Sequence, residues 1–132
     1  MVREKLCSYE ILEGKIHHLT LHEASRYSID EMMEQLYQII ETAPKDQTLR
    51  TFIDESHAPQ MVPLNYIAFR LRDIMERYPE RPPGRTVLML RQNLFTDLLS
   101  RLIRIVVRGV DRVRIFPPQQ VDEALAWLGR DD

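Results

Sequence analysis

The chain is 132 residues long, which suits one domain around one hydrophobic core, and its net charge is −2. Apolar residues make up 44% of the sequence and charged residues 29%, the balance of a soluble globular protein, which excludes a disordered chain. Because there is no apolar run of about 18 residues, no signal peptide and only one cysteine, Cys7, we expect a cytoplasmic protein without a membrane span or an intrachain disulfide.

The first expected elements are two strands and a helix. Residues 9–12 and 16–21 flank Gly14, which tolerates a positive φ, so this part predicts a β-hairpin. Ser28 and Glu31 have the spacing of a capping box, and apolar residues follow at helical intervals. We therefore expect an amphipathic helix over residues 29–42.

Strands and helices alternate in the rest of the chain. Further strands are expected at 49–53, 86–90 and 112–116, and further helices from Pro63 onward, over 94–108 and over 119–128. The order β-β-α-β-α-β-α-β-α predicts an α/β fold with a single mixed, mainly parallel sheet of about five strands and four helices. One domain is expected over residues 1–132.

A polar segment follows the expected strand at 49–53. Its four residues are Asp54, Glu55, Ser56 and His57. Three of them are the residue types of a hydrolase triad, but neighbouring side chains point apart, and the sequence has no Gly-x-Ser-x-Gly motif. We expect a turn in which Asp54 or Ser56 caps backbone donors, and we expect no enzymatic activity.

Other residues that carry chemistry in proteins are also interpreted as structural. His18 and His22 would lie about 13 Å apart on one face of a strand, too far to share a metal ion. The glycines are not spaced for a phosphate loop, and Cys7 is expected to pack rather than react. The sequence therefore predicts neither a metal nor a cofactor.

The expected helix over 94–108 is the best candidate for an interaction surface. Residues 61–116 carry 11 basic side chains, all arginine, against 5 acidic ones, and this helix combines an arginine stripe with a broad apolar sector. The predicted surface comprises Met61, Val62, Tyr66, Leu99, Arg101, Ile103, Arg104 and Arg108. It would form a homodimer or bind an acidic protein partner, unless the domain's own core uses the apolar sector. Nucleic acid is not expected, because the isoelectric point is about 6.1.

Two motifs add a family resemblance to this element order. They are Phe52-Ile-Asp-Glu-Ser56 and the ending Arg114-Ile-Phe116 followed by Val121-Asp-Glu-Ala-Leu-Ala-Trp-Leu128. With them, the chain resembles the STAS superfamily, in particular its SpoIIAA-like branch. The resemblance implies a non-enzymatic regulatory or protein-interaction module. It also implies that Ser56 corresponds to the serine whose phosphorylation is the family's switch, within a switch loop of Asp54, Glu55 and His57.

The same resemblance implies an alternative function. The branch is similar to lipid-carrying SEC14-type domains, in which a small apolar ligand would lie between the sheet and the second and third helices. The residues that would line such a pocket are Tyr66, Phe69, Ile74, Phe95 and Leu99. The competing interpretation is that these side chains fill a core, because a large cavity removes packing that a chain of this length needs.

Overall fold

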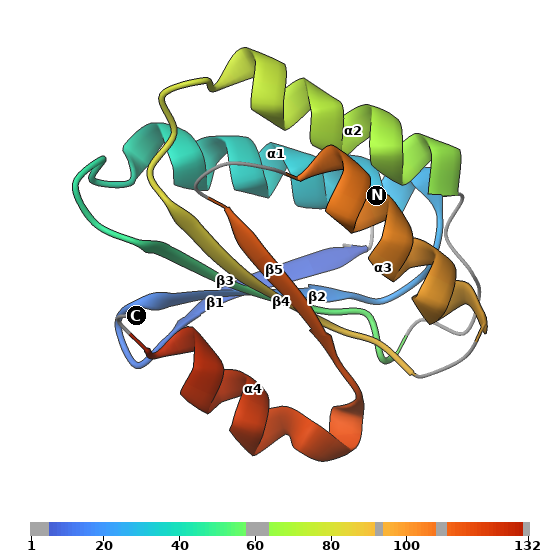
Figure 1. The fold of residues 1–132 in the computed structure, drawn as a ribbon. Helices are drawn as coiled ribbons and strands as arrows, with labels where there is room; N and C mark the ends of the chain where they lie inside the picture. Colours follow the sequence, from blue (N-terminus) through green and yellow to red (C-terminus); the bar gives the residue numbers. More distant parts are fainter. Residues whose placement is uncertain (1–5, 58–63, 92–93, 108–110, 131–132) are drawn as a thin grey trace, which may run out of the picture.

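The computed structural model describes residues 6–57, 64–91, 94–107 and 111–130. Its strands are β1 (Cys7–Leu12), β2 (Ile16–Leu21), β3 (Leu49–Asp54), β4 (Gly84–Met89) and β5 (Arg112–Phe116). Its helices are α1 (Arg26–Thr42), α2 (Leu64–Arg77), α3 (Leu94–Val106), the short 3-10 helix η1 (Pro118–Gln120) and α4 (Val121–Leu128). One sheet separates α1, α2 and α3 on one face from α4 on the other (Figure 1). The expected order of elements is confirmed.

The five strands lie in the sheet in chain order. β1 and β2 pair antiparallel, and each later pair is parallel, so the sheet is mixed and mainly parallel as predicted. In the hairpin turn, Gly14 has a φ of 71° and Glu13 a φ of 52°, while the Lys15 N–H donates to the Leu12 carbonyl at 3.1 Å. Because β3, β4 and β5 are parallel, their carboxyl ends meet at one edge.

Helix α1 begins earlier than its sequence predicts. Its N-cap is Ser25, and Ser25 and Ser28 each donate a backbone N–H to the other's hydroxyl oxygen at 3.1 Å. The prediction of a capping box between Ser28 and Glu31 is therefore wrong. The Glu31 carboxylate instead accepts from the Leu6 N–H at 3.0 Å, which ties the start of β1 to α1.

The core is divided by the sheet into two layers. On the α4 face, Phe52, Val87, Phe116 and Leu128 are buried together with Trp127, whose ring lies 6.3 Å from that of Phe116. Ala124, Trp127 and Leu128 of the Val121–Leu128 motif thus pack on strands that come from three different parts of the chain. The other layer lies under α1 and α3 and includes Ile29, Met33, Leu99 and Ile103.

Helix α2 is the outermost element of its face (Figure 1). It packs mainly against α3 and α1. Three tyrosine hydroxyls donate to carboxylates between the α1 and α2 segments: Tyr37 to Asp73, Tyr66 to Asp30, and Tyr78 to Glu41. None of the helices in the described ranges combines the length and apolar character needed to cross a membrane.

Candidate functional site

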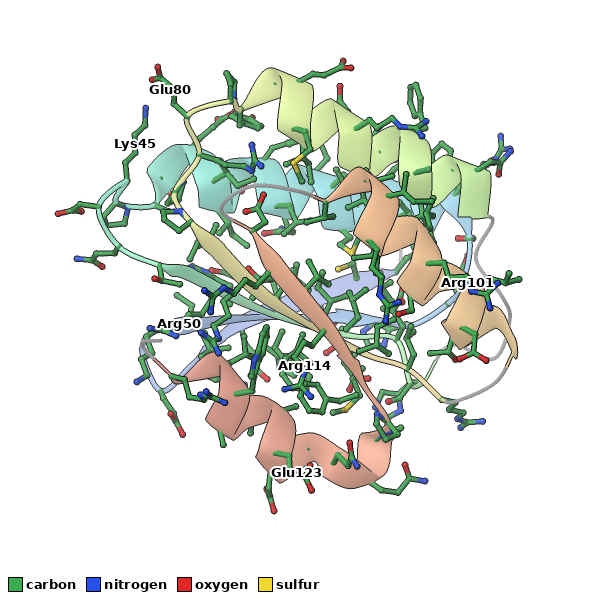
Figure 2. All side chains as sticks on the ribbon, in the orientation of Figure 1. Lys45, Arg50, Glu80, Arg101, Arg114 and Glu123 are labelled. Carbon is green, nitrogen blue, oxygen red and sulfur yellow. The ribbon has the colours of Figure 1, made fainter. Side chains whose placement is uncertain are left out.

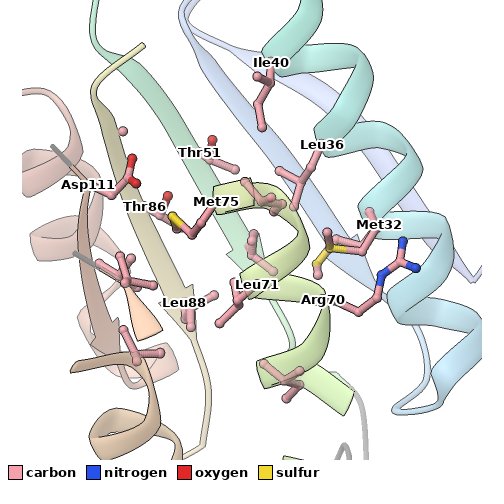
Figure 3. Close-up of a pocket in the computed structure, with 18 of the residues that line it drawn as sticks. Met32, Leu36, Ile40, Thr51, Arg70, Leu71, Met75, Thr86, Leu88 and Asp111 are labelled. Atoms are coloured by element: carbon pink, nitrogen blue, oxygen red, sulfur yellow. The ribbon is translucent and has the colours of Figure 1, made fainter. Parts of the chain in front are cut away.

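A partly enclosed, mainly apolar cavity of about 140 Å³ lies between the sheet and helices α1, α2 and α3 (Figure 3). Its floor consists of side chains from β3, β4 and β5: Leu49, Thr51, Ile53, Thr86, Leu88 and Val113. Side chains of α2, including Leu71 and Met75, lie across from this floor. The cavity therefore lies between the sheet and α2, the helix that packs least directly on the sheet.

Two short side chains on the floor help to explain the cavity. Thr51 and Thr86 are Cα partners in the β3–β4 register, so they lie side by side. Of their neighbours on the same face of these strands, Leu49, Ile53 and Leu88 are larger, and Gly84 has no side chain. Protein interiors are usually packed to the density of organic crystals. Because Thr51 and Thr86 are small and adjacent, and α2 does not pack closely on them, the volume above them is left unfilled.

This cavity is large enough to affect stability. For enclosed cavities made by truncating core side chains, stability falls by about 24 cal/mol per Å³, so roughly 3 kcal/mol is the upper bound for a partly open cavity of 140 Å³. That is a large share of the roughly 5–15 kcal/mol by which domains are stable. An apolar molecule in the cavity would restore van der Waals contacts and offset this loss.

Charged residues lie at the cavity's margins. Glu55, just beyond β3, contributes to the lining, and burial raises the pKa of its carboxyl group to about 7, with the Asp54 carboxylate adding to the rise. Arg81 and Asp111 also line the cavity and form an ion pair in which Arg81 Nε donates to Asp111 Oδ2 at 2.8 Å. Gly84 leaves room for this pair, because a Cβ there would lie 2.7 Å from Asp111 Oδ1.

The predicted switch loop forms a capped turn at the end of β3. Asp54 Oδ1 accepts from the Ser56 N–H at 2.9 Å and from the Ser56 hydroxyl at 2.5 Å. His57 Nε2 lies 3.6 Å from Asp54 Oδ2. The expectation that Asp54 or Ser56 caps this turn is confirmed. Ser56 is only 8% exposed. Its hydroxyl donates a hydrogen bond to the Asp54 carboxylate, whereas the serine of a hydrolase triad donates to the histidine imidazole.

Comparisons with known proteins identify the fold. No family model matches the chain, and no curated protein matches it. Among solved structures, the chain is similar to an uncharacterized protein of the DUF3478 family with a SpoIIAA-like fold from Shewanella loihica PV-4. The two are 13% identical, the match covers 92% of this chain and 91% of that chain, and the TM-score is 0.62.

The chain has a SpoIIAA-like fold. The predicted resemblance and fold class are thereby confirmed at the level of the fold. In this SpoIIAA-like fold, the turn at Asp54–His57 lies at the carboxyl edge of the sheet. An open cleft of mixed polar and apolar surface beside it is lined by Ser56, His57, Arg91 and residues 117–120.

The predicted interaction surface on α3 requires a correction. Leu99 and Ile103 are only 1% and 7% exposed, because this side of α3 faces the core of the SpoIIAA-like fold. Leu98 and Ile105, which share another side of the helix, are 45% and 61% exposed. Arg101 is also exposed and lies on the outer side of α3 (Figure 2).

The remaining members of that predicted surface differ in their positions. Arg104 is exposed. Tyr66 is partly buried, and its hydroxyl donates to Asp30. Met61, Val62 and Arg108 lie outside the described residues.

Of the five residues predicted to line an apolar pocket or fill a core, two belong to the buried core and also line the cavity. Ile74 and Leu99 line the cavity, whereas Phe69 is 62% exposed and Tyr66 is not part of the lining. The side chain of Phe95 lies outside the described part of the structure. Sequence reasoning missed the floor, because the pairing of Thr51 with Thr86 depends on the register of β3 and β4.

Cysteine and histidine occupy structural positions in the described chain. Cys7 is 5% exposed, and burial raises the pKa of its thiol to about 11, with the Glu31 and Glu55 carboxylates adding to the rise, so its predicted packing role is confirmed. His18 and His22 contact different partners, Glu10 at 3.0 Å and Ser8 at 2.6 Å. Within the described residues, no three histidine, cysteine or acidic side chains gather as a possible metal site.

Proposed function

We propose that this SpoIIAA-like domain is a non-enzymatic binding module that holds a small apolar molecule in the cavity between the sheet and α2. The observation that carries this proposal is the cavity itself, about 140 Å³ in volume and mainly apolar in its lining. An engineered protein cavity of about 150 Å³ binds benzene, so this volume suits a ligand of about six to ten non-hydrogen atoms. The ligand would be much smaller than a phospholipid.

The position of α2 supports reversible entry of such a ligand. Floor residues Thr86 and Leu88 are partly rather than fully buried, so the sheet is not sealed by the helices above it. The tyrosine–carboxylate bonds connect α2 to α1 and leave its packing toward the floor incomplete. An apolar ligand would be favoured by the area it removes from water.

Toluene is a suitable first probe, because it fits the volume and carries no polar group. We expect toluene at about ten times its Kd to raise the free energy of unfolding of the wild-type domain by roughly 1.4 kcal/mol. The variant Leu88→Phe would fill part of the cavity and lose this effect, whereas Leu98→Phe, the same change at an exposed site on α3, would keep it. Thermal and urea unfolding measure both effects.

Two results would count against the proposal. One is wild-type stability that does not respond to toluene up to saturation. The other is an equal response in Leu88→Phe and Leu98→Phe, which would place the ligand outside the cavity. Native mass spectrometry of the purified wild-type protein adds an independent readout, because a co-purified apolar molecule would appear as an added mass that Leu88→Phe lacks.

A second candidate function, docking of a protein partner, is supported by the surface of α3. Leu98 and Ile105 lie two turns apart on one side of the helix, beside the exposed Arg101. Paired with the same strip of a second copy, these side chains would form the centre of a homodimer. Light scattering would then give a dimer mass for the wild type and for Ile11→Asp, an exposed apolar residue on β1, but a monomer mass for Leu98→Asp. A wild-type monomer, or an unchanged mass in Leu98→Asp, would exclude this dimer.

A further inference from the structure

Two hydroxyl groups lie next to each other on the floor of the apolar cavity. Thr51 on β3 and Thr86 on β4 both line it, and they are partners across neighbouring strands about 4.8 Å apart (Figure 3). Thr51 is only 3% exposed. At this separation, one polar group of a ligand is within reach of both hydroxyls.

Neither hydroxyl is engaged by the described protein. Among the described residues, no protein group hydrogen-bonds the side chain of Thr51 or of Thr86, and neither hydroxyl oxygen is fully buried, so solvent in the cavity reaches both. An apolar ligand that displaces this solvent would leave both hydroxyls without partners, and a polar group loses free energy when its bonds to water are not replaced. A ligand group that restores these bonds is therefore favoured at this part of the floor over a purely apolar one.

The charged groups that line the cavity do not bind the polar group of the ligand in place of Thr51 and Thr86. Glu55 is four residues beyond Thr51, which corresponds to about 13 Å along a strand. Asp111 already accepts from Arg81. Arg70 also lines the cavity, and its guanidinium lies 3.9 Å from the Asp30 carboxylate, which offsets its charge, although its Nε is buried without a hydrogen-bond partner. An ionised group placed against the two neutral hydroxyls would be poorly compensated in an apolar surrounding, whereas a hydroxyl or carbonyl matches their capacity to donate and accept.

We propose that Thr51 and Thr86 together select small neutral molecules that carry one hydroxyl or carbonyl group on an apolar body. This inference rests on the proposed function and specifies its ligand class. The apolar body would lie against Leu71, Leu88 and the other aliphatic side chains, and the polar group would lie against the two threonines.

Phenol and toluene form a matched pair of probes, because they differ only in a hydroxyl against a methyl group. Thr51→Val and Thr86→Val make the same exchange in the protein with little change of shape. We expect phenol to bind the wild type, and its Kd relative to that of toluene to rise about fivefold or more in either variant, the effect of one lost hydrogen bond. Thr51→Ser keeps the hydroxyl and should retain the wild-type ratio, as should Thr20→Val, a strand threonine outside the cavity lining.

Each outcome of the calorimetric titrations is decisive once circular dichroism has shown that a variant is folded. If toluene binds but phenol does not, or if neither valine variant changes the ratio, the threonine pair does not select the ligand and is served by water. The proposed function survives that result. If neither probe binds the wild type, the proposed function fails, and this inference fails with it.

Discussion

Glu55 lines the cavity, and its carboxyl group should make the stability of the folded protein depend on pH. Burial, together with the neighbouring Asp54 carboxylate, raises its pKa from 4.5 to about 7. The folded protein therefore binds this proton more tightly than the unfolded chain does. The stability that this adds is fully present below the unfolded-state pKa of 4.5 and is lost as the pH rises through about 7.

Replacing Glu55 by glutamine should remove this dependence. Between about pH 5 and about pH 8, the variant should gain stability relative to the wild type by up to about 3 kcal/mol. Urea unfolding at both pH values measures the difference, and Glu34→Gln, at an exposed position on α1, serves as the control. A difference between Glu55→Gln and wild type that does not change with pH would show that Glu55 titrates normally.

Ser56 has a structural role that any phosphorylation must disturb. Its hydroxyl donates to Asp54, so Ser56→Ala should lose about 1 kcal/mol of stability. Ser56→Asp should lose more near neutral pH, because it places a second carboxylate beside Asp54, and a phosphate would add still more charge there. Unfolding free energies of both variants at neutral and acidic pH test this. Equal losses of stability in Ser56→Ala and Ser56→Asp at neutral pH would mean that the turn tolerates an anion.

At the scale of elements, local patterns predicted type and order better than boundaries and orientation. The two serines at the start of α1 were present in the sequence, but Ser28 and Glu31 matched a capping box as well, and Glu31 bonds to Leu6, which lies far away in sequence. The apolar sector of α3 is wide, so spacing alone does not say whether Leu98 or Leu99 faces the sheet. Only the packing partners decide this.

The attachment of α2 to α1 gives a prediction at the same scale. Tyr37→Phe removes the hydroxyl that donates to Asp73, so α2 should open more often. Its backbone amides should exchange with solvent about three- to tenfold faster, whereas those of α4 should be unchanged. Tyr9→Phe, which breaks a bond to His17 in the hairpin, is the control. Equal protection of α2 in Tyr37→Phe and wild type would mean that apolar packing alone holds this helix.

At the scale of the whole molecule, the two faces of the sheet are packed differently. Val87 and Met89 point toward α4 and are buried in a filled core, while Thr86 and Leu88 of the same strand point toward the cavity. Alternation along one strand thus serves packing on one side and binding on the other. The fold was predictable because it follows from the order of elements. The cavity was not, because it depends on the register that places Thr51 beside Thr86.

The proposed ligand site is the cavity on the α1–α3 face of the sheet. Methyl NMR during a toluene titration tests it most directly, because Leu71, Ile74 and Leu88 line the cavity and Val87 and Leu128 lie on the opposite face. A ligand in the cavity would give saturable shifts of the first three residues and leave the signals of the other two unchanged. Absence of shifts at the cavity methyls, or equal shifts on both faces, would contradict it.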